Sequence, residues 1–313
     1  MGFDDFKKNV LLAPYTSLRV GGVAEYFFEA KSSEELKEAL TTATQKKIHV
    51  TVLGGGQNVL VADKGVKGLV VLVRFKKITI EANTVYAEAG VALGELLAKV
   101  SLAGLSGFEW AGGLPGTVGG AIFGNAGTFG HAIGELVEYV EVLDTDLLLK
   151  KISQEECEFG YRTSVFKSAL RGHVITGAKL RLQRGEISDV QKELRERVLW
   201  RSKHHPPYHS AGCIFKNPAE EHYHRVSFDA VDAEGKPVEW FGRVPAGWLI
   251  DRAGLKGMVV GGAKVSEVHA NFVTNAKNAT AEDVITLISI IKERVHRKFG
   301  VLLQEEVQYL GFK

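Results

Sequence analysis

The stretch that decides the fold is EWAGGLPGTVGGAIFGNAGTFG, Glu109–Gly130, in which glycine recurs every one to four residues. Between Gly104 and Gly134 there are eleven glycines in 31 residues, whereas glycine averages about 7% of ordinary proteins. This spacing is too close for a packed strand or helix, and glycine lets a ligand approach the main chain. The stretch predicts a wall of backbone amides that faces a planar or phosphorylated cofactor. A set of tight turns in a β-rich region is the alternative.

A second glycine loop lies nearer the N-terminus, in VLGGGQNVLVAD, Val52–Asp63. Three glycines follow an apolar strand there, and their N–H groups could cradle a diphosphate. No long helix follows at once, so the loop is not a dinucleotide fingerprint, and a plain turn is the alternative. Within the first stretch, Thr117 and Asn125 are the side chains best suited to hydrogen-bond a cofactor, although Thr117 could equally cap a helix.

The composition narrows the class of protein. A length of 313 residues suggests about two domains of roughly 150 residues. A net charge of +2 gives no argument for nucleic acid, and two cysteines cannot build a disulfide framework or a four-cysteine metal site. No apolar run approaches the ~20 residues that span a bilayer, and the N-terminus has no signal pattern. We therefore expect a cytoplasmic enzyme with free thiols, no metal, and no nucleic-acid or membrane partner.

Helix and strand patterns are mixed irregularly along the chain, which favours an α+β fold. Ser32 and Glu35 form a capping box that predicts a helix up to Ala43. Thr280 and Asp283 form a similar pair ahead of a long amphipathic helix that Gly300 stops. The HHPPY segment, residues 204–208, is the best linker candidate.

Three further segments carry reactive side chains. In FGYRTSVFK, residues 159–167, alternation along a strand would place Tyr161 and Arg162 on opposite faces, and a surface salt bridge is the ordinary fate of such an arginine. SAGCIFKNP, residues 210–218, holds one of the two cysteines, and a free cysteine is most often a small buried hydrophobe. The last segment holds Glu305 and Glu306, one of which should point inward.

These segments, in this order, resemble the UDP-N-acetylenolpyruvoylglucosamine reductases, the MurB enzymes. The resemblance runs from YTSLRVGGVAEYF to EEVQYLG and includes the segments LGGGQN, GLPGTVGGAIFGNAG, FGYRTSVFK, AGCIFKNP, AGWLIDRAGLKG and HANFVTN. It implies a two-part FAD-binding domain of the vanillyl-alcohol-oxidase (PCMH) type and a C-terminal α/β substrate-binding domain. The chain lacks room for a clamping loop after residue 167, so it is similar to the shorter second class of the family.

The resemblance also implies an activity and a domain division. The activity is that of a UDP-N-acetylmuramate dehydrogenase, in which NADPH reduces non-covalently bound FAD and the enolpyruvyl substrate becomes UDP-N-acetylmuramate for peptidoglycan. The expected division is a FAD-binding domain over residues 1–200, with subdomains of about 1–75 and 76–200. A substrate-binding domain follows over residues 201–303, and a strand over residues 304–313 returns to the FAD domain. We expect a monomer.

Site residues carry over position by position. The family's catalytic arginine falls on Arg162, its glutamate on Glu306, and its proton donor, commonly a serine, on Cys213. The family's Gly-Ser-Asn reads Gly56-Gln57-Asn58, so one hydroxyl contact to the FAD diphosphate is missing. The positions implied to bind FAD are Gly54, Gly55, Gly56, Gln57, Asn58, Gly112, Gly113, Pro115, Gly116, Thr117, Gly119, Gly120, Asn125 and Gly127. Those implied to bind substrate are Tyr161, Lys203, Lys216, Asn217, His269 and Asn271.

The implied reaction explains why a cysteine suits position 213. Hydride addition to the enolpyruvyl methylene leaves negative charge on the adjacent carbon and its carboxylate, which a fixed cation such as Arg162 would stabilise. The charged carbon then needs a proton, and a thiol with a reference pKa near 8.5 is a competent acid while it stays protonated. Glu306 is useful there if burial keeps it neutral. Cys157 lacks such a context and is expected to be structural.

Two other classes remain open. A flavin oxidase that shares the FAD domain would reduce oxygen, but it should carry a different C-terminal domain. A non-catalytic FAD- or nucleotide-binding regulator should lack one or more of Arg162, Cys213 and Glu306, all of which are present.

Overall fold

The computed structural model describes residues 2–219 and 242–312, and the chain divides into two compact units. The first unit comprises Met1–Leu12, Val23–Gly56 and Gly65–Lys203, and the second comprises Ala13–Gly22, Gln57–Lys64 and His204–Lys313. Both units mix helices with strands, which confirms the predicted α+β class.

A four-stranded sheet forms one part of the first unit, in the order β1-β2-β5-β3. β1 is antiparallel to β2, whereas β2 and β3 both run parallel to β5. The predicted helix packs against β2 and β5, and its N-cap Ser32 accepts a hydrogen bond from the Glu35 N–H at 3.1 Å. The elements are β1 (Lys7–Leu11), β2 (Val23–Ala30), α1 (Ser33–Gln45), β3 (Val50–Leu53) and β5 (Val66–Val73).

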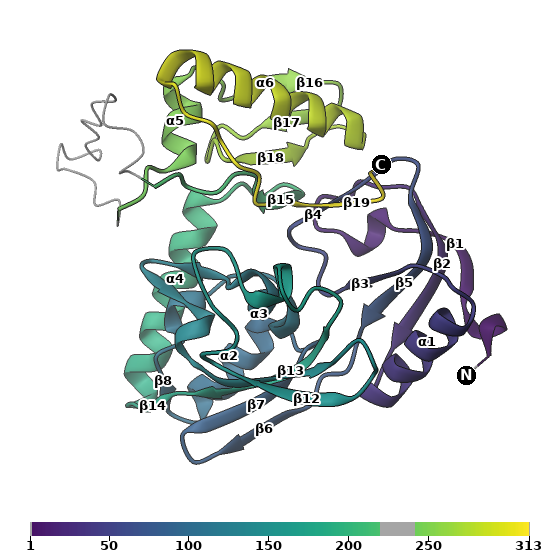
Figure 1. Cartoon of the computed structure of the whole chain (residues 1–313). Coiled ribbons are helices and arrows are strands. Elements are labelled where there is room, and N and C mark those ends of the chain that lie inside the picture. The colour runs from purple at the N-terminus through teal and green to yellow at the C-terminus, as the bar shows by residue number, and fades with distance from the viewer. Residues whose placement is uncertain (1, 220–241, 313) are drawn as a thin grey trace. The chain divides into compact units, whose positions relative to one another are not determined.

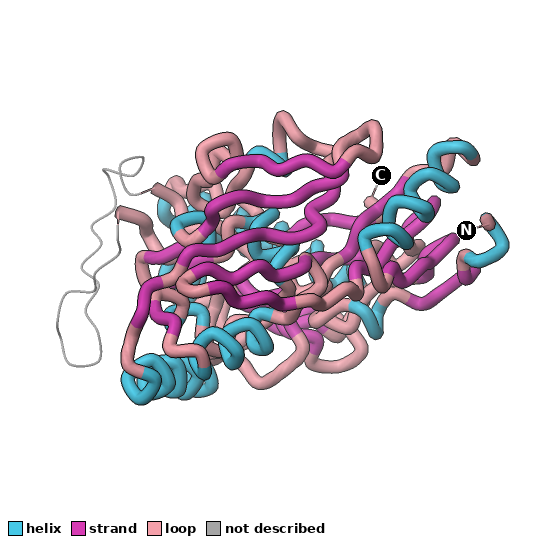
Figure 2. The backbone as a smooth tube through the Cα atoms, turned by 90° about the horizontal axis from the view of Figure 1, so that it is seen from below, coloured by secondary structure: helices cyan, strands magenta, loops and turns pink. Residues whose placement is uncertain are grey.

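A five-stranded antiparallel sheet, ordered β12-β11-β13-β7-β6, forms the other part of this unit, and its strands run side by side in Figure 2. The helix α3 lies against β13 and β7. The elements are β6 (Ile78–Glu81), β7 (Thr84–Glu88), α2 (Leu93–Leu102), α3 (Val118–Gly124), β11 (Val137–Leu143), β12 (Leu149–Ser153) and β13 (Val174–Arg181).

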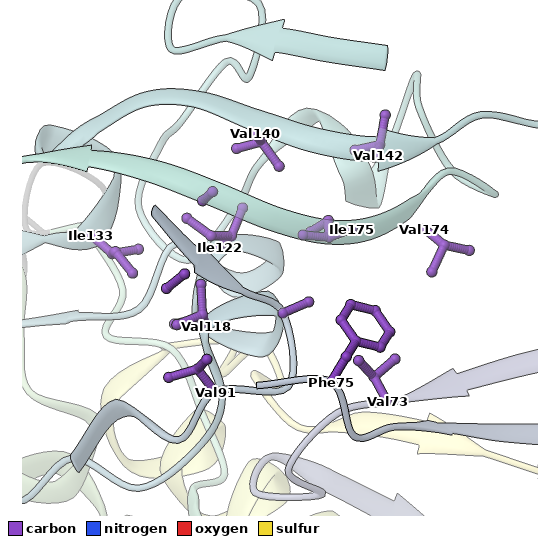
Figure 3. Close-up of a cluster of buried hydrophobic side chains, with 14 of the residues drawn as sticks. Val73, Phe75, Val91, Val118, Ile122, Ile133, Val140, Val142, Val174 and Ile175 are labelled. Carbon is purple, nitrogen blue, oxygen red and sulfur yellow. The ribbon is translucent and has the colours of Figure 1, made fainter. Parts of the chain in front are cut away.

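One hydrophobic core joins the two sheets of the first unit. Figure 3 shows Val140 of β11 near Ile122 of α3, while Val73 and Phe75 lie at the end of β5. Two short strand pairs also belong to this unit. β8 (Leu105–Ser106) pairs with β14 (Gln183–Arg184), and β9 (Gly127–Thr128) pairs with β10 (His131–Ala132). The helix α4 spans Ile187–His204, and short 3-10 helices cover Phe3–Asp5, Glu109–Ala111, Ile133–Glu135 and Val165–Lys167.

The second unit is built on a four-stranded antiparallel sheet, β15-β18-β17-β16. The long helix α6 contacts β16 and β17 (Figure 1) and has the predicted Thr280–Asp283 capping box and a left-handed Gly300 stop. β4 and β19 form a separate parallel pair. The elements are β4 (Val59–Val61), β15 (Ser210–Cys213), α5 (Ala246–Arg252), β16 (Val259–Val260), β17 (Ala263–Val265), β18 (Phe272–Asn275), α6 (Ala281–Phe299) and β19 (Gln308–Leu310), with a 3-10 helix at Ala13–Tyr15.

The compact units differ from the expected domain boundaries in the assignment of two segments. Residues 13–22 and 57–64 belong to the second unit, although they lie far from it in the sequence. The last strand, β19, was expected to return to the FAD-binding domain, and it pairs with β4, which lies within the expected residues 1–200 of that domain and which the compact units assign to the second unit. These backbone pairings join segments about 250 residues apart, which sequence position alone does not reveal. Among the helices described, none is long and apolar enough to cross a membrane.

Candidate active site

The two glycine loops of the first unit touch each other. A Cβ atom built on Gly54 would lie 2.8 Å from Thr117 Oγ1, and one on Gly55 would lie 3.3 Å from Gly116 Cα. Gly56 and Gly116 both have positive φ angles, of +63° and +127°. Side chains at these positions would push the loops apart or strain the backbone, so glycine is required for their contact.

Thr117 lies at the junction of these loops, and its predicted alternatives were a helix cap and a ligand contact. It occupies the N-cap position of α3, yet its hydroxyl makes no capping bond. Its Oγ1 is buried without a hydrogen-bond partner among residues 2–219 and 242–312. Because a buried hydroxyl without a partner is costly, a polar ligand group at this junction would satisfy it. A glycine cradle with an unsatisfied hydroxyl fits the diphosphate of FAD.

Several other glycines of the decisive stretch are explained by packing within the protein. A Cβ on Gly112 would lie 2.9 Å from Arg197 Cβ of α4, and one on Gly119 would lie 2.8 Å from Ala89 Cβ. Arg201, a buried residue of α4, donates from Nε to the Gly112 carbonyl at 2.6 Å. Gly120 differs, because a Cβ there would meet only Thr117 Oγ1, at 3.6 Å. Of these three glycines, Gly120 therefore fits a cofactor-facing role better than Gly112 and Gly119.

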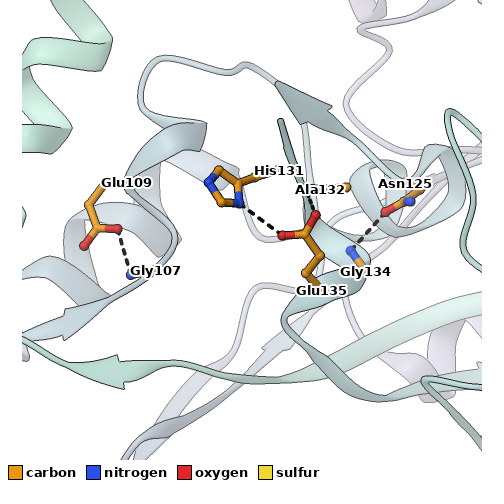
Figure 4. A network of polar contacts seen from close by, with 7 residues as sticks. All are labelled: Gly107, Glu109, Asn125, His131, Ala132, Gly134 and Glu135. Carbon is orange, nitrogen blue, oxygen red and sulfur yellow. Dashed lines mark hydrogen bonds and ion pairs between the residues drawn. The ribbon is translucent and has the colours of Figure 1, made fainter. Parts of the chain in front are cut away.

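Asn125 joins this stretch to the segment that holds the predicted catalytic arginine. It ends α3 in the left-handed conformation, and its Oδ1 accepts from the Gly134 N–H at 2.9 Å (Figure 4). Its Nδ2 donates to the Gly160 carbonyl at 2.9 Å. Contacts within the protein thus use part of the hydrogen-bonding capacity of the Asn125 side chain, which was predicted to bind the cofactor.

Tyr161 and Arg162 form a two-residue turn, so the predicted strand with alternating faces is wrong. Gly160 and Thr163 exchange two backbone hydrogen bonds, of 3.1 and 3.2 Å, which close the turn. Arg162 has a φ of +55°, and its guanidinium lies over the Tyr161 ring, 5.7 Å from the centroid. Lys167 Nζ donates to the Arg162 carbonyl at 2.8 Å. The turn therefore holds a half-buried guanidinium and an exposed phenol together.

The second unit brings the backbones of the Cys213 and Glu306 segments together. Cys213 ends β15 after a bulge at Gly212, whose φ is +74°, and it is half-buried. The neighbouring Ile214 carbonyl accepts from the Glu306 N–H at 2.7 Å. Glu305 is engaged elsewhere, since its Oε1 pairs with Lys292 Nζ at 2.7 Å. The backbone of Glu306 therefore lies beside the residue that follows Cys213.

The other predicted substrate residues of this unit have structural contacts of their own. The buried Asn271 side chain bonds both the N–H and the carbonyl of Phe215, at 3.0 and 2.8 Å. Asn217 Oδ1 accepts from the Ala246 N–H at the start of α5, at 3.0 Å. Burial lowers the pKa of His269 to about 4, with smaller contributions from nearby positive charges, so this imidazole is neutral at pH 7. It can offer a hydrogen bond but no charge.

The two lysines that were predicted to bind substrate differ in exposure. Lys203 is exposed at the end of the first unit, and Lys216 is half-buried, with its N–H bonded to the Gln304 carbonyl at 2.9 Å. The Gln57 carbonyl accepts from Ser17 Oγ at 2.9 Å, and the Asn58 amide bonds the Cys213 strand.

Cys157 is fully buried, and burial raises its pKa to about 12. Sequence reasoning missed the structural role of Arg201, because a buried arginine inside a helix has no local signature.

Comparison with known proteins first gives the class of protein to which the chain belongs. Residues 24–149 match the profile of a FAD binding domain, which contains the Gly54–Gly56 loop and the glycine-rich stretch. Together with the cradle around Thr117, this match defines a FAD-dependent oxidoreductase. Residues 204–310 match the C-terminal domain of UDP-N-acetylenolpyruvoylglucosamine reductase. Among the described residues, no group of three or more His, Cys, Asp or Glu side chains could hold a metal ion.

Similar proteins then give the family. The chain is 36% identical over 302 residues to the UDP-N-acetylenolpyruvoylglucosamine reductase of Alkaliphilus oremlandii, covering 95% of this chain and 90% of that one. It is 37% identical over 305 residues to that of a Synechococcus strain, covering 96% and 89%. The crystal structure of the Thermus caldophilus enzyme superposes with a TM-score of 0.78 at 32% identity, covering 97% and 99%. The chain belongs to the family of UDP-N-acetylenolpyruvoylglucosamine reductases, as the resemblance predicted.

Proposed function

We propose that this chain reduces the enolpyruvyl group of UDP-N-acetylglucosamine enolpyruvate with NADPH, giving UDP-N-acetylmuramate for peptidoglycan synthesis. The observation that carries this proposal is the bond between the Glu306 N–H and the Ile214 carbonyl, which places a carboxyl group and the Cys213 thiol on adjacent segments. A carboxyl group and a thiol on adjacent segments suit the protonation of a carbanion-like centre, which a flavin oxidase does not need.

The reaction adds two hydrogens to the substrate. The terminal methylene carbon gains a hydride and becomes a methyl group, while the carbon that bears the carboxylate gains a proton. FAD, when bound, supplies the chemistry by which a hydride from NADPH reaches the substrate. Gly54, Gly55 and Gly116 would let the backbone approach its diphosphate, and the Thr117 hydroxyl would hydrogen-bond to it.

The first unit supplies the positive charge in this proposal. The Arg162 guanidinium would bind the substrate carboxylate and stabilise the negative charge that develops there. The positive φ of Arg162 and the two bonds of the Gly160–Thr163 turn hold this residue in place before substrate arrives. Such preorganisation makes the electrostatic stabilisation effective without rearrangement during the reaction. Tyr161 would contact the substrate from the same turn.

The second unit supplies the proton. The Cys213 thiol would deliver it to the charged carbon, and the resulting thiolate would recover a proton from solvent or from a neighbouring acid. Glu306 would hold a proton or orient the donor. Lys203 and Lys216 would bind phosphate groups as point charges, and His269 would contribute as a neutral hydrogen-bonding group. Asn217 and Asn271 would support the substrate site mainly by ordering the backbone that they already contact.

The finer assignments follow from the same reasoning. We assign FAD binding to the first unit and the UDP-sugar substrate mainly to the second. We also infer that the protein works as a monomer in the cytoplasm, without nucleic-acid or membrane partners, because the charge is near neutral and the substrates are soluble nucleotides.

Steady-state turnover tests this function. Purified holoprotein should oxidise NADPH only when the enolpyruvyl substrate is present, and mass spectrometry should find a product heavier by two hydrogens. UDP-N-acetylglucosamine, which lacks the double bond, is the matched control and should give no turnover. NADPH oxidation that depends on oxygen and ignores the enolpyruvyl substrate would instead indicate an oxidase.

A further inference from the structure

Asn58 bonds two carbonyl groups of the strand that carries Cys213. Its Nδ2 donates to the Ala211 carbonyl at 2.9 Å and to the Cys213 carbonyl at 3.2 Å. All three residues belong to the second unit, although Asn58 precedes the strand by more than 150 residues. Both N–H donors of the carboxamide are therefore directed at one short backbone segment, on either side of Gly212.

The geometry of β15 explains why this segment needs a donor. Within the described part of the chain, β15 is an edge strand whose only neighbour in its sheet is β18. A bulge interrupts its register between Ser210 and Cys213, and Gly212 has a φ of +74°. A bulge breaks the regular ladder and re-aims the side chains beside it. The carboxamide of Asn58 takes the place of a neighbouring strand and fixes this bulge, and with it the direction of the Cys213 side chain.

The same asparagine is also connected to the segment of Glu306. Its backbone carbonyl accepts from the Gln308 N–H at 2.9 Å. The Gln308 side chain in turn donates from Nε2 to the Glu306 carbonyl at 3.0 Å. Asn58 thus holds the strand of the thiol with its side chain and the segment of the carboxyl group with its main chain.

We propose that Asn58 is a positioning residue for proton delivery, which sets the Cys213 thiol against the Glu306 carboxyl group through contacts within the second unit. This inference rests on the proposed function, since it assumes that Cys213 delivers the proton. It gives Asn58 a role different from the FAD contact that the sequence resemblance implies. A variant of Asn58 should therefore keep its cofactor and its reaction with NADPH but protonate the substrate slowly.

Two variants separate this role from cofactor binding. Asn58→Asp keeps the shape but loses both donors, and Asn58→Ala leaves the two carbonyls open to water. In each, FAD content and anaerobic flavin reduction by NADPH should match the wild type. Reoxidation by the enolpyruvyl substrate should slow by about tenfold to a hundredfold, which is what misplacement of a catalytic group by about 1 Å costs. The solvent deuterium isotope effect on this step should rise, because proton transfer becomes more rate-limiting.

Alkylation of Cys213 gives a readout that does not depend on turnover. The rate of its modification by iodoacetamide should change in both Asn58 variants, because the direction and surroundings of the thiol change. Cys157 is fully buried with a raised pKa, so it should stay unmodified in the folded protein and not obscure the measurement.

Asn275→Asp is the matched control. Asn275 belongs to the same unit and likewise donates from Nδ2 to a backbone carbonyl, that of Leu18 at 3.2 Å. This variant should lower the melting temperature without changing substrate reoxidation, its isotope effect or Cys213 alkylation.

Three results would overturn the inference. The first is loss of FAD from either Asn58 variant, which would assign the residue to the cofactor. The second is reoxidation at the wild-type rate, and the third is an equal slowing in Asn275→Asp, which would reduce Asn58 to general stability. Failure of the wild-type enzyme itself to reduce the substrate would instead refute the proposed function.

Discussion

Burial of His269 should make the stability of the second unit depend on pH. The ring lies 4.8 Å from Phe272 and 6.0 Å from His205 between centroids, and its Nδ1 accepts from the Asn271 N–H at 3.2 Å. Burial, with smaller contributions from the charges of Lys256 and His204, lowers the pKa of this imidazole from 6.5 to about 4. The folded protein therefore holds His269 neutral under conditions in which the unfolded chain would protonate it.

The sign and size of the effect follow from linkage. Below pH 6.5 the unfolded state binds a proton that the folded state refuses until about pH 4, so the free energy of unfolding falls as pH falls through this window. A shift of about 2.5 units corresponds to about 3 kcal/mol in full, at 1.36 kcal/mol per unit. Between pH 7 and pH 4.5, His269 alone should account for a loss of about 2 kcal/mol.

Urea unfolding of the wild type and of His269→Asn at pH 7 and pH 4.5 measures this loss. Asparagine offers an oxygen that can accept the same Asn271 N–H, but it does not titrate. Carboxylates titrate in both proteins and cancel in the comparison. The wild type should lose about 2 kcal/mol more than the variant on acidification. Equal losses in the two proteins would show that His269 is accessible to protons when folded, and the reasoning would fail.

Five further substitutions, at four positions, test the site. Gly120→Val should give folded, colourless protein, because the new Cβ meets only a hydroxyl of the protein. Gly119→Val should also lower the melting temperature, because its Cβ clashes with Ala89. Yellow Gly120→Val protein would contradict the proposed FAD cradle. Arg162→Lys should accept hydride from NADPH normally but lose about a hundredfold in substrate-driven flavin reoxidation, and a normal rate in stopped flow would remove this residue from the mechanism. Cys213→Ala should accept hydride from NADPH but fail in substrate-driven flavin reoxidation, whereas Cys213→Ser should retain partial activity. If the alanine variant is reoxidised at the wild-type rate, the thiol has only a packing role.

The helices and the family were predictable because their signals are local or ordered along the chain. The N-cap at Ser32 and the capping box at Thr280 gave the starts of α1 and α6, since the bonds that form them span three residues. The Tyr161–Arg162 turn was not predictable from alternation, because two backbone bonds across Gly160 and Thr163 decide it.

Long-range contacts account for most of what the sequence left open at the site. The close spacing of glycines predicted a cradle, but spacing cannot separate Gly112, which packs against α4, from Gly120, which has open space beside it. The amide of Asn58 finds its acceptors more than 150 residues away, so a cofactor role was the natural interpretation of its loop. The thiol at position 213 was recognised from its flanking motif, whereas its support from Asn58 required the structure.

An anaerobic flavin titration tests the central claim most directly. The purified protein should show flavin absorbance that NADPH bleaches, and one equivalent of the enolpyruvyl substrate should restore it without oxygen. Restoration with formation of UDP-N-acetylmuramate is the predicted result. A protein without flavin absorbance, or a reduced flavin that only oxygen reoxidises, would contradict the account.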